Sequence, residues 1–279
     1  MKTIVCLGVV LAFASCAAAG GPPPDGKLHG AIEFSYLTSY IWRGFDVYGP
    51  SGDSGIAPAV TLDLFGSGFG FRTQANRAVH SGFENTERWD YTIFYRNMLW
   101  PDARHAMAYH IGYVYYNYPD NSRTLADLSE MQGAFSFPQL LGIKGLVPTY
   151  VLVKLWPANS GSLVASRVDL TRGILSRGTA SGWAHIFMLD YGIPITPLLP
   201  NQKEQAIRLH SEFVFNDGVG PAGQDVDHDW SNAVFGILTD FELGGGFSFT
   251  PAFYIQSSWD DSVNTENEYW AVLTMQYRF

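Results

Sequence analysis

Apolar and polar side chains alternate along most of this chain. Trp89, Tyr91 and Ile93, for example, share one face of their segment, while Asp90 and Thr92 share the other. A period of two residues indicates a β-strand with two chemically different faces. The same alternation recurs in residues 32–42, 58–64, 69–76, 89–96, 107–115, 130–137, 147–155, 183–193, 207–215, 232–241, 247–256 and 269–279. The pattern therefore predicts twelve strands.

The connections between these segments alternate in length. Glycine-rich stretches such as 66–68 and 243–245 allow tight turns, whereas longer and more polar connections occupy residues 43–55, 78–87, 117–124, 157–181, 217–229 and 259–267. Each strand has about the 9–11 residues that a tilted strand needs to cross a bilayer. We therefore predict an all-β protein, a closed antiparallel transmembrane β-barrel of about 12 strands. Its turns would be short on the periplasmic side, and its loops would be long on the extracellular side.

Composition supports a membrane barrel rather than a soluble domain. The chain of 279 residues contains 19 Phe, 8 Trp and 15 Tyr, and only 15% of its residues are charged. Soluble domains carry about 25% charged residues. The mean hydropathy is near zero, and no stretch supplies the 18 or more apolar residues of a transmembrane helix. The net charge of −9 argues against a nucleic-acid partner.

The N-terminal segment has the features of an export signal. Lys2 precedes an apolar run, and small residues at Ala17 and Ala19 suit a cleavage site after Ala19. We therefore expect a signal peptide at residues 1–19, a Gly/Pro-rich linker at 20–28 and the barrel at 29–279. Lipidation at Cys16 is a second possibility for this segment. The only other cysteine is Cys6, so the exported body would contain no internal disulfide.

The two faces of the predicted strands carry different chemistry. The aromatic and aliphatic face would meet lipid, with Tyr40, Trp42, Trp89, Trp183 and Tyr269 forming girdles at the membrane boundaries. The opposite face would line the lumen with Glu33, Asp63, Arg72, Asp90, Arg96, Glu130, Lys154, Asp190, Arg208, Glu212, Asp240 and Arg278. Alternation alone does not say which face is inside, so a secreted β-sandwich with an aromatic core remains an alternative.

The C-terminal segment resembles the assembly signal of bacterial outer-membrane barrels. Residues 269–279 alternate and end in an aromatic residue, with Tyr277 and Phe279 at the positions of that signal. The resemblance implies an outer membrane as the location, and outer-membrane lipids and the barrel-assembly machinery as partners.

A second resemblance covers residues 29–97. Its motifs are Thr-Ser-Tyr-Ile-Trp-Arg-Gly at 38–44, Ala-Pro-Ala-Val at 57–60, Gly-Ser-Gly-Phe at 66–69 and Glu-Arg-Trp-Asp at 87–90. These motifs resemble the TorF-like porin family of bacterial outer-membrane proteins. The resemblance implies a barrel with a suspected channel, and it implies no catalytic residues.

The function expected from these features is passive passage of small polar solutes. A barrel of 12 strands lies between side-chain-filled barrels of about 8 strands and open pores of about 16–18. Acidic residues outnumber basic ones on the expected inner face, so selectivity should lean weakly towards cations. The alternative is a closed structural or surface barrel in which the inward charges pair across the lumen. The long 157–181 connection, with Arg167, Asp169, Arg172 and Arg177, is a candidate constriction.

Two further groups of residues resemble parts of an enzyme site and of a metal site. His185 and Ser211 share the outward face on neighbouring strands, and symmetric pairing would place Ser211 opposite Phe187 and diagonal to His185. An outward acid to orient such a lipid-hydrolase pair is missing, so we expect no enzyme. Asp225, Asp227 and Asp229 start like a calcium loop, but Trp230 and Gly236 occupy its glycine and glutamate positions. We therefore expect no metal and no cofactor.

Overall fold

The computed structural model describes residues 25–48, 54–82, 87–120, 127–158, 181–200, 202–219, 225–259 and 266–279. The expected signal peptide, most of the linker, and the charged residues of the 157–181 connection lie outside these residues. Among the described residues, no helix is long and apolar enough to cross a membrane.

Strands make up nearly all of the regular structure in this part of the chain. Their bounds are β1 (His29–Leu37), β2 (Ile41–Trp42), β3 (Phe45–Asp46), β4 (Gly55–Asp63), β5 (Phe69–Ala78), β6 (Arg88–Leu99), β7 (Met107–Asn117), β8 (Leu128–Ser136), β9 (Leu146–Pro157), β10 (Gly182–Ile195), β11 (Gln205–Val219), β12 (Asp225–Thr239), β13 (Phe241–Gly244), β14 (Phe247–Ser258) and β15 (Glu268–Arg278).

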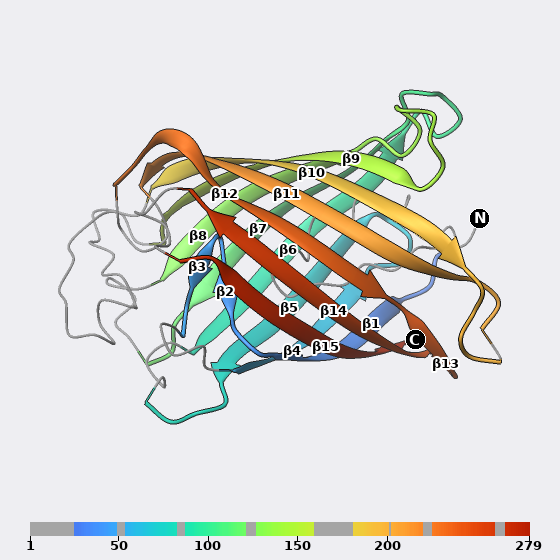
Figure 1. Cartoon of the computed structure of the whole chain (residues 1–279), viewed down its shortest axis with the longest axis horizontal. Helices are drawn as coiled ribbons and strands as arrows, with labels where there is room; N and C mark the ends of the chain where they lie inside the picture. Colours follow the sequence, from blue (N-terminus) through green and yellow to red (C-terminus); the bar gives the residue numbers. More distant parts are fainter. Residues whose placement is uncertain are drawn as a thin grey trace.

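Twelve of these strands form one closed antiparallel barrel (Figure 1). Each wall strand pairs with its neighbours in the chain, β12 pairs with β14, and β1 pairs with β15 to complete the ring. The short strand β13 continues the wall after β12, against β14. The prediction of a twelve-stranded antiparallel barrel is confirmed, and the β-sandwich is wrong because one sheet closes on itself.

The β1–β15 pairing joins the two ends of the described chain. The backbone N–H of Phe279 donates to the carbonyl of Gly30 at 3.0 Å, and the N–H of Gly30 donates back to the carbonyl of Phe279 at 3.0 Å. Closure of this kind pairs the backbone N–H and C=O groups that the edges of an open sheet would expose to lipid. The C-terminal strand therefore completes the hydrogen-bonded wall.

The outer face of the barrel is apolar, as the alternation predicts. Many of its large side chains remain exposed in the isolated chain, including Ile32, Phe34, Ile93, Met131, Phe187, Phe235, Phe253 and Leu273. An exposed apolar surface on a closed barrel is suited to lipid contact. The protein is thus a membrane-spanning barrel of the outer-membrane type, with its polar alternate positions directed inwards.

The first expected segment, 32–42, is the exception to the predicted pattern. Strand β1 ends at Leu37, and the chain then turns into the barrel as the hairpin β2–β3. Tyr40 and Trp42 are buried, at 2% and 8% exposure, so their assignment to a lipid-facing girdle is wrong. Aromatic side chains suit a lipid boundary and a packed interior equally well, and the alternation does not distinguish the two.

Candidate functional site in the barrel interior

The interior wall is built by every second residue of the long strands. In β6, Arg88, Thr92 and Phe94 are buried, while the intervening Trp89 and Tyr91 are exposed on the outside. This arrangement follows from the alternation of side chains along a pleated strand. The interior is therefore the place where polar and charged groups from all strands can meet.

The structure places eleven of the twelve sequence-predicted lumen residues on this inner face. They are Glu33, Asp63, Arg72, Asp90, Arg96, Glu130, Asp190, Arg208, Glu212, Asp240 and Arg278. Most of them form ion pairs with one another or with a third group. Most of these pairs join residues of one strand, of paired strands or of strands with one other strand between them, because all of these side chains share the inner face.

Ion pairs near the periplasmic end link strands that have one other strand between them. Arg72 on β5 contacts Glu33 on β1 at 2.6 Å across β4, and Arg96 on β6 contacts Asp63 on β4 at 2.9 Å across β5. On the other side of the ring, Arg208 donates to both carboxylate oxygens of Asp240, at 3.0 and 2.9 Å. These pairs balance charge along the wall, so the interior is polar without a strong field of one sign.

An acidic pair flanks a histidine on strands β10 and β11. The Nδ1 atom of His210 lies 2.7 Å from Asp190, and its Nε2 atom lies 3.8 Å from Glu212. Alternation indicated His210 as inward, together with Glu212 and Arg208 of the same strand. His210 therefore belongs with the lumen residues, although it was not among those predicted from the sequence.

Lys154 lies on the opposite face, and its prediction as a lumen residue is corrected. Its register partner is the exposed Trp183, and its Nζ atom lies 5.1 Å from the centroid of that indole ring. The neighbouring residues Val151, Val153 and Leu155 point inwards and are buried. Strand β9 was assigned the wrong way round, because its apolar side chains face an apolar part of the interior.

That apolar strip runs along the inner wall of strands β8 to β11. Its members are buried and pack together: Ala134, Val151, Val153, Ala184, Ile186, Met188 and Val214. The sequence contains a signal for it, because residues 184–189 of β10 are nearly continuously apolar rather than alternating. Such runs are typical of strands that are buried on both faces.

The hairpin β2–β3 enters the interior from the extracellular end. Its register pairs Ile41 with Asp46 and Trp42 with Phe45, which leaves Arg43 and Gly44 as a two-residue turn. Both turn residues have positive φ, 56° and 81°, as in the tight hairpin turns that match strand twist. The left-handed conformation is unfavourable for an arginine, so contacts of its side chain must compensate for it.

The tip of the hairpin is held from two sides of the barrel. The Nη2 atom of Arg43 donates to the Oε1 atom of Glu130 on β8 at 2.6 Å, and Glu130 is 1% exposed. The Nε2 atom of Gln256 on β14 donates to the carbonyl of Gly44 at 2.8 Å. Strands β8 and β14 are separated by four wall strands on one side of the ring. The hairpin therefore spans the interior.

Arg88 of the wall strand β6 contacts the aromatic side chains of the hairpin segment. The guanidinium carbon of Arg88 lies 4.2 Å from the ring centroid of Trp42 and 4.6 Å from that of Tyr116. The same guanidinium donates to Asp90 through Nε and Nη2, and to the hydroxyl of Tyr40 at 2.7 Å. This combination of cation–π contacts and charged hydrogen bonds fixes Trp42 in place.

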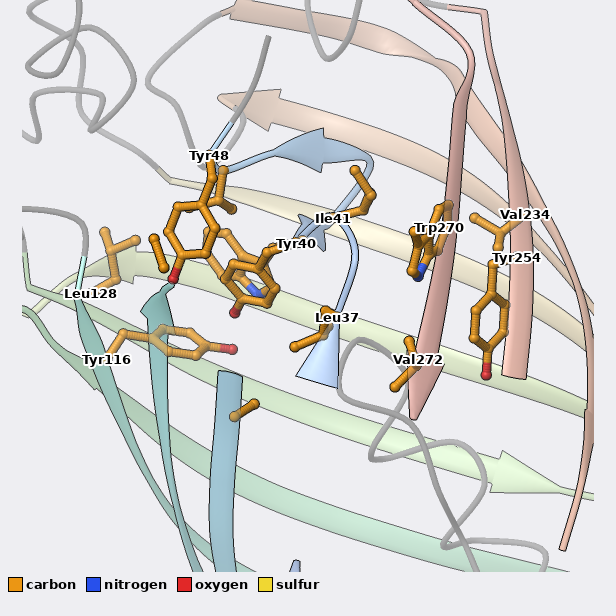
Figure 2. Packing of buried hydrophobic residues seen from close by; sticks show 14 of the residues in the cluster. Leu37, Tyr40, Ile41, Tyr48, Tyr116, Leu128, Val234, Tyr254, Trp270 and Val272 are labelled. Atoms are coloured by element: carbon orange, nitrogen blue, oxygen red, sulfur yellow. The ribbon is translucent and has the colours of Figure 1, made fainter. Parts of the chain in front are cut away.

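Apolar packing completes the contact between the hairpin and the wall. Figure 2 shows Tyr40, Ile41 and Tyr48 surrounded by wall residues that include Leu128, Val234, Trp270 and Val272. Neither Arg43 nor Arg88 was predicted as a lumen residue. For Arg88 the available signal was alternation, because it lies two residues before the inward Asp90. For Arg43 the signal was its place in the short motif at 38–44.

The structure contradicts the geometry expected for a lipid-hydrolase pair. Ser211 pairs with Leu189, and His185 pairs with Phe215, so four residues of strand separate the two side chains, or about 13 Å. The Nδ1 atom of His185 lies 2.7 Å from the hydroxyl of Tyr150, and the hydroxyl of Ser211 donates to the carbonyl of Leu189. The register differs from symmetric pairing by two residues, and Ser211 and His185 do not meet.

Metal-ligating side chains do not cluster in the part of the chain that the structure describes. No group of three or more His, Cys, Asp or Glu residues there could hold an ion. The acidic triplet that begins at Asp225 lies at the start of β12. The side chains of Asp225 and Asp227 are not among those that the structure describes.

A closed antiparallel barrel with an apolar exterior and a charged interior defines the class of outer-membrane porin-like barrels. Two solved structures of this class resemble the chain. The KdgM porin matches with a TM-score of 0.50 and 9% sequence identity, over 89% of this chain and 99% of that chain. The NanC porin matches with a TM-score of 0.51 and 7% identity, over 89% and 98% of the respective chains.

These identities show a shared fold alone. A scan against protein-family models gives no match, and a search of curated proteins gives none either.

Proposed function

We propose that the protein is an outer-membrane porin that gives passive passage to small polar solutes. The observation that carries the proposal is the interior wall, where carboxylates and guanidinium groups from most strands face into a closed ring. Polar and charged linings let hydrated solutes pass, and an apolar exterior holds such a wall in lipid. The porin fold shared with KdgM and NanC supports this function.

The proposed passage is narrow. A ring of 12 strands is smaller than the rings of about 16–18 strands that leave wide aqueous channels. The hairpin β2–β3 takes up part of the cross-section at the extracellular end. Small hydrophilic molecules are therefore the solute class we assign, and we propose no larger substrate.

A closed surface barrel without conductance is the second candidate. The same hairpin favours it, because ion pairs and buried aromatic side chains fill the upper interior. Passive function without catalysis is part of both candidates. The separation of Ser211 from His185 along the wall supports the absence of lipid hydrolysis at this pair.

We also propose membership of the TorF-like porin family. The support comes from the motifs at 38–44 and 87–90, which contact one another in the barrel through Trp42 and Arg88. Outer-membrane lipids around the apolar face and the barrel-assembly machinery at the C-terminal strand are the proposed partners.

Conductance across a planar lipid bilayer tests the proposal. The purified, refolded protein should insert and produce discrete current steps of uniform size. A heat-modifiable gel shift confirms that the sample is folded. Folded protein that inserts but gives no steps would favour the closed barrel.

A further inference from the structure

The hairpin β2–β3 is attached to the barrel without being part of its wall. The two strands form a separate two-stranded sheet, and within the described residues no ladder joins either of them to a wall strand. The hairpin contacts the wall through side chains and through individual backbone groups. Displacing the hairpin would therefore leave the hydrogen-bonded ring intact.

We infer that this hairpin is the constriction of the channel, and that the ion pair between Arg43 and Glu130 is the latch that holds it across the interior. The inference rests on the proposed porin function. It assigns the narrowest point to residues 38–48, whereas the sequence suggested the 157–181 connection.

The position of the latch supports this role. Arg43 lies at the tip of the hairpin, and its partner Glu130 is on β8, while Gln256 holds the adjacent carbonyl from β14. A tip anchored from two distant strands must cross the interior between them. The ion pair is nearly buried, with side-chain exposures of 20% and 1%, so loss of one charge leaves the other without compensation.

The chemistry at the tip indicates what the constriction selects. Arg43 and Glu130 neutralise one another, and Asp90 neutralises the nearby Arg88. A constriction of compensated charges discriminates by solute size more than by the sign of charge. We therefore assign small hydrophilic solutes of either charge to it, with larger oligomeric solutes excluded at the hairpin.

Charge reversal at the tip tests the latch. Arg43→Glu places two carboxylates together and should expel the hairpin, so we expect the single-channel conductance to rise roughly twofold or more as the open cross-section grows. The charge-swapped double variant Arg43→Glu/Glu130→Arg restores opposite charges and should return the conductance towards the original value.

Arg77→Gln is the matched control. It breaks an ion pair with Glu87 at 3.6 Å, and Arg77 occupies an outward position of β5 with a side-chain exposure of 61%, away from the lumen. This variant should leave the conductance and the solute size limit nearly unchanged. Swelling of protein-loaded liposomes in sugars of increasing size reports that limit, and the heat-modifiable gel shift confirms folding of each variant.

The outcomes separate the latch from the porin function. Larger steps in Arg43→Glu that the charge swap reverses support both. A silent original protein that conducts only as Arg43→Glu would support the latch and overturn passive passage through the original protein. Equal steps in the original, Arg43→Glu and Arg77→Gln proteins would refute the latch while the porin function stands. Folded proteins that are all silent would refute the channel itself and, with it, the constriction.

Discussion

Arg88 connects two short sequence motifs that lie far apart in the chain. It belongs to the motif at 87–90, and the indole ring that it covers belongs to Trp42 in the motif at 38–44. Asp90, from the same motif as Arg88, accepts hydrogen bonds from that guanidinium group at 2.6 and 2.9 Å. Trp42 of one motif and Arg88 and Asp90 of the other thus belong to a single contact cluster inside the barrel.

Removal of the Arg88 charge should destabilise this cluster. We expect Arg88→Gln to lower the free energy of unfolding by about 3 kcal/mol, because a buried cation–π contact is lost and the Asp90 carboxylate loses its counter-charge. Urea unfolding in lipid vesicles, followed by tryptophan fluorescence, measures the change.

Arg77→Gln provides the control for that measurement. Arg77 is 61% exposed and lies 3.6 Å from Glu87, so its loss should change the free energy of unfolding by less than about 0.5 kcal/mol. Equal effects of the two substitutions would contradict the role given to Arg88.

At the scale of single elements, the terminal strand β15 has two neighbours with different roles. Its register with β14 runs from Phe247↔Tyr277 to Gln256↔Glu268, and its register with β1 closes the ring. Phe279 extends this closure by exchanging two backbone hydrogen bonds with Gly30, and its ring stacks 6.2 Å from Tyr277. The proposed assembly signal and the closing seam therefore coincide.

Deletion of Phe279 should reduce the amount of folded barrel in the outer membrane. The deletion removes both hydrogen bonds to Gly30 and the terminal aromatic ring of the proposed signal. Quantifying the heat-modifiable form in isolated outer membranes tests this expectation. Phe279→Tyr keeps the backbone and the ring and should assemble normally, whereas normal levels of the deletion variant would count against the signal.

Elements also differ in how far alternation predicts them. In β6 and β7 the polar and apolar faces are distinct, and the predicted orientation agrees with the burial of Thr92 and His110. In β9 and β10 apolar side chains lie on both faces, so Lys154 was placed on the wrong side. The hairpin β2–β3 continues the alternation of β1, which hides its inward turn.

At the scale of the whole molecule, the inward charges of the residues that the structure describes nearly balance in sign. The carboxylates are Glu33, Asp63, Asp90, Glu130, Asp190, Glu212 and Asp240, and the guanidinium groups are Arg43, Arg72, Arg88, Arg96, Arg208 and Arg278. The lumen residues predicted from the sequence include Lys154, which faces outwards, and do not include Arg43 and Arg88. The structure thus reduces the expected preference for cations.

We expect the channel to discriminate weakly between potassium and chloride. The permeability ratio from the reversal potential in a KCl gradient should lie within about threefold of unity, because paired charges leave little net field. Arg96→Gln leaves Asp63 uncompensated and should shift the ratio towards cations. A ratio above about ten in the original protein would contradict the charge balance.

The alternation along the chain was sufficient for the number of wall strands and for the division of most of them into an apolar and a polar face. These properties follow from local periodicity, which each segment carries by itself. The closure of the sheet by β1 and β15, the inward turn of the hairpin, the contact of Arg43 with Glu130 and the orientation of β9 depended on the tertiary structure. They arise from contacts between distant strands, and periodicity shows which residues share a face without showing what that face meets.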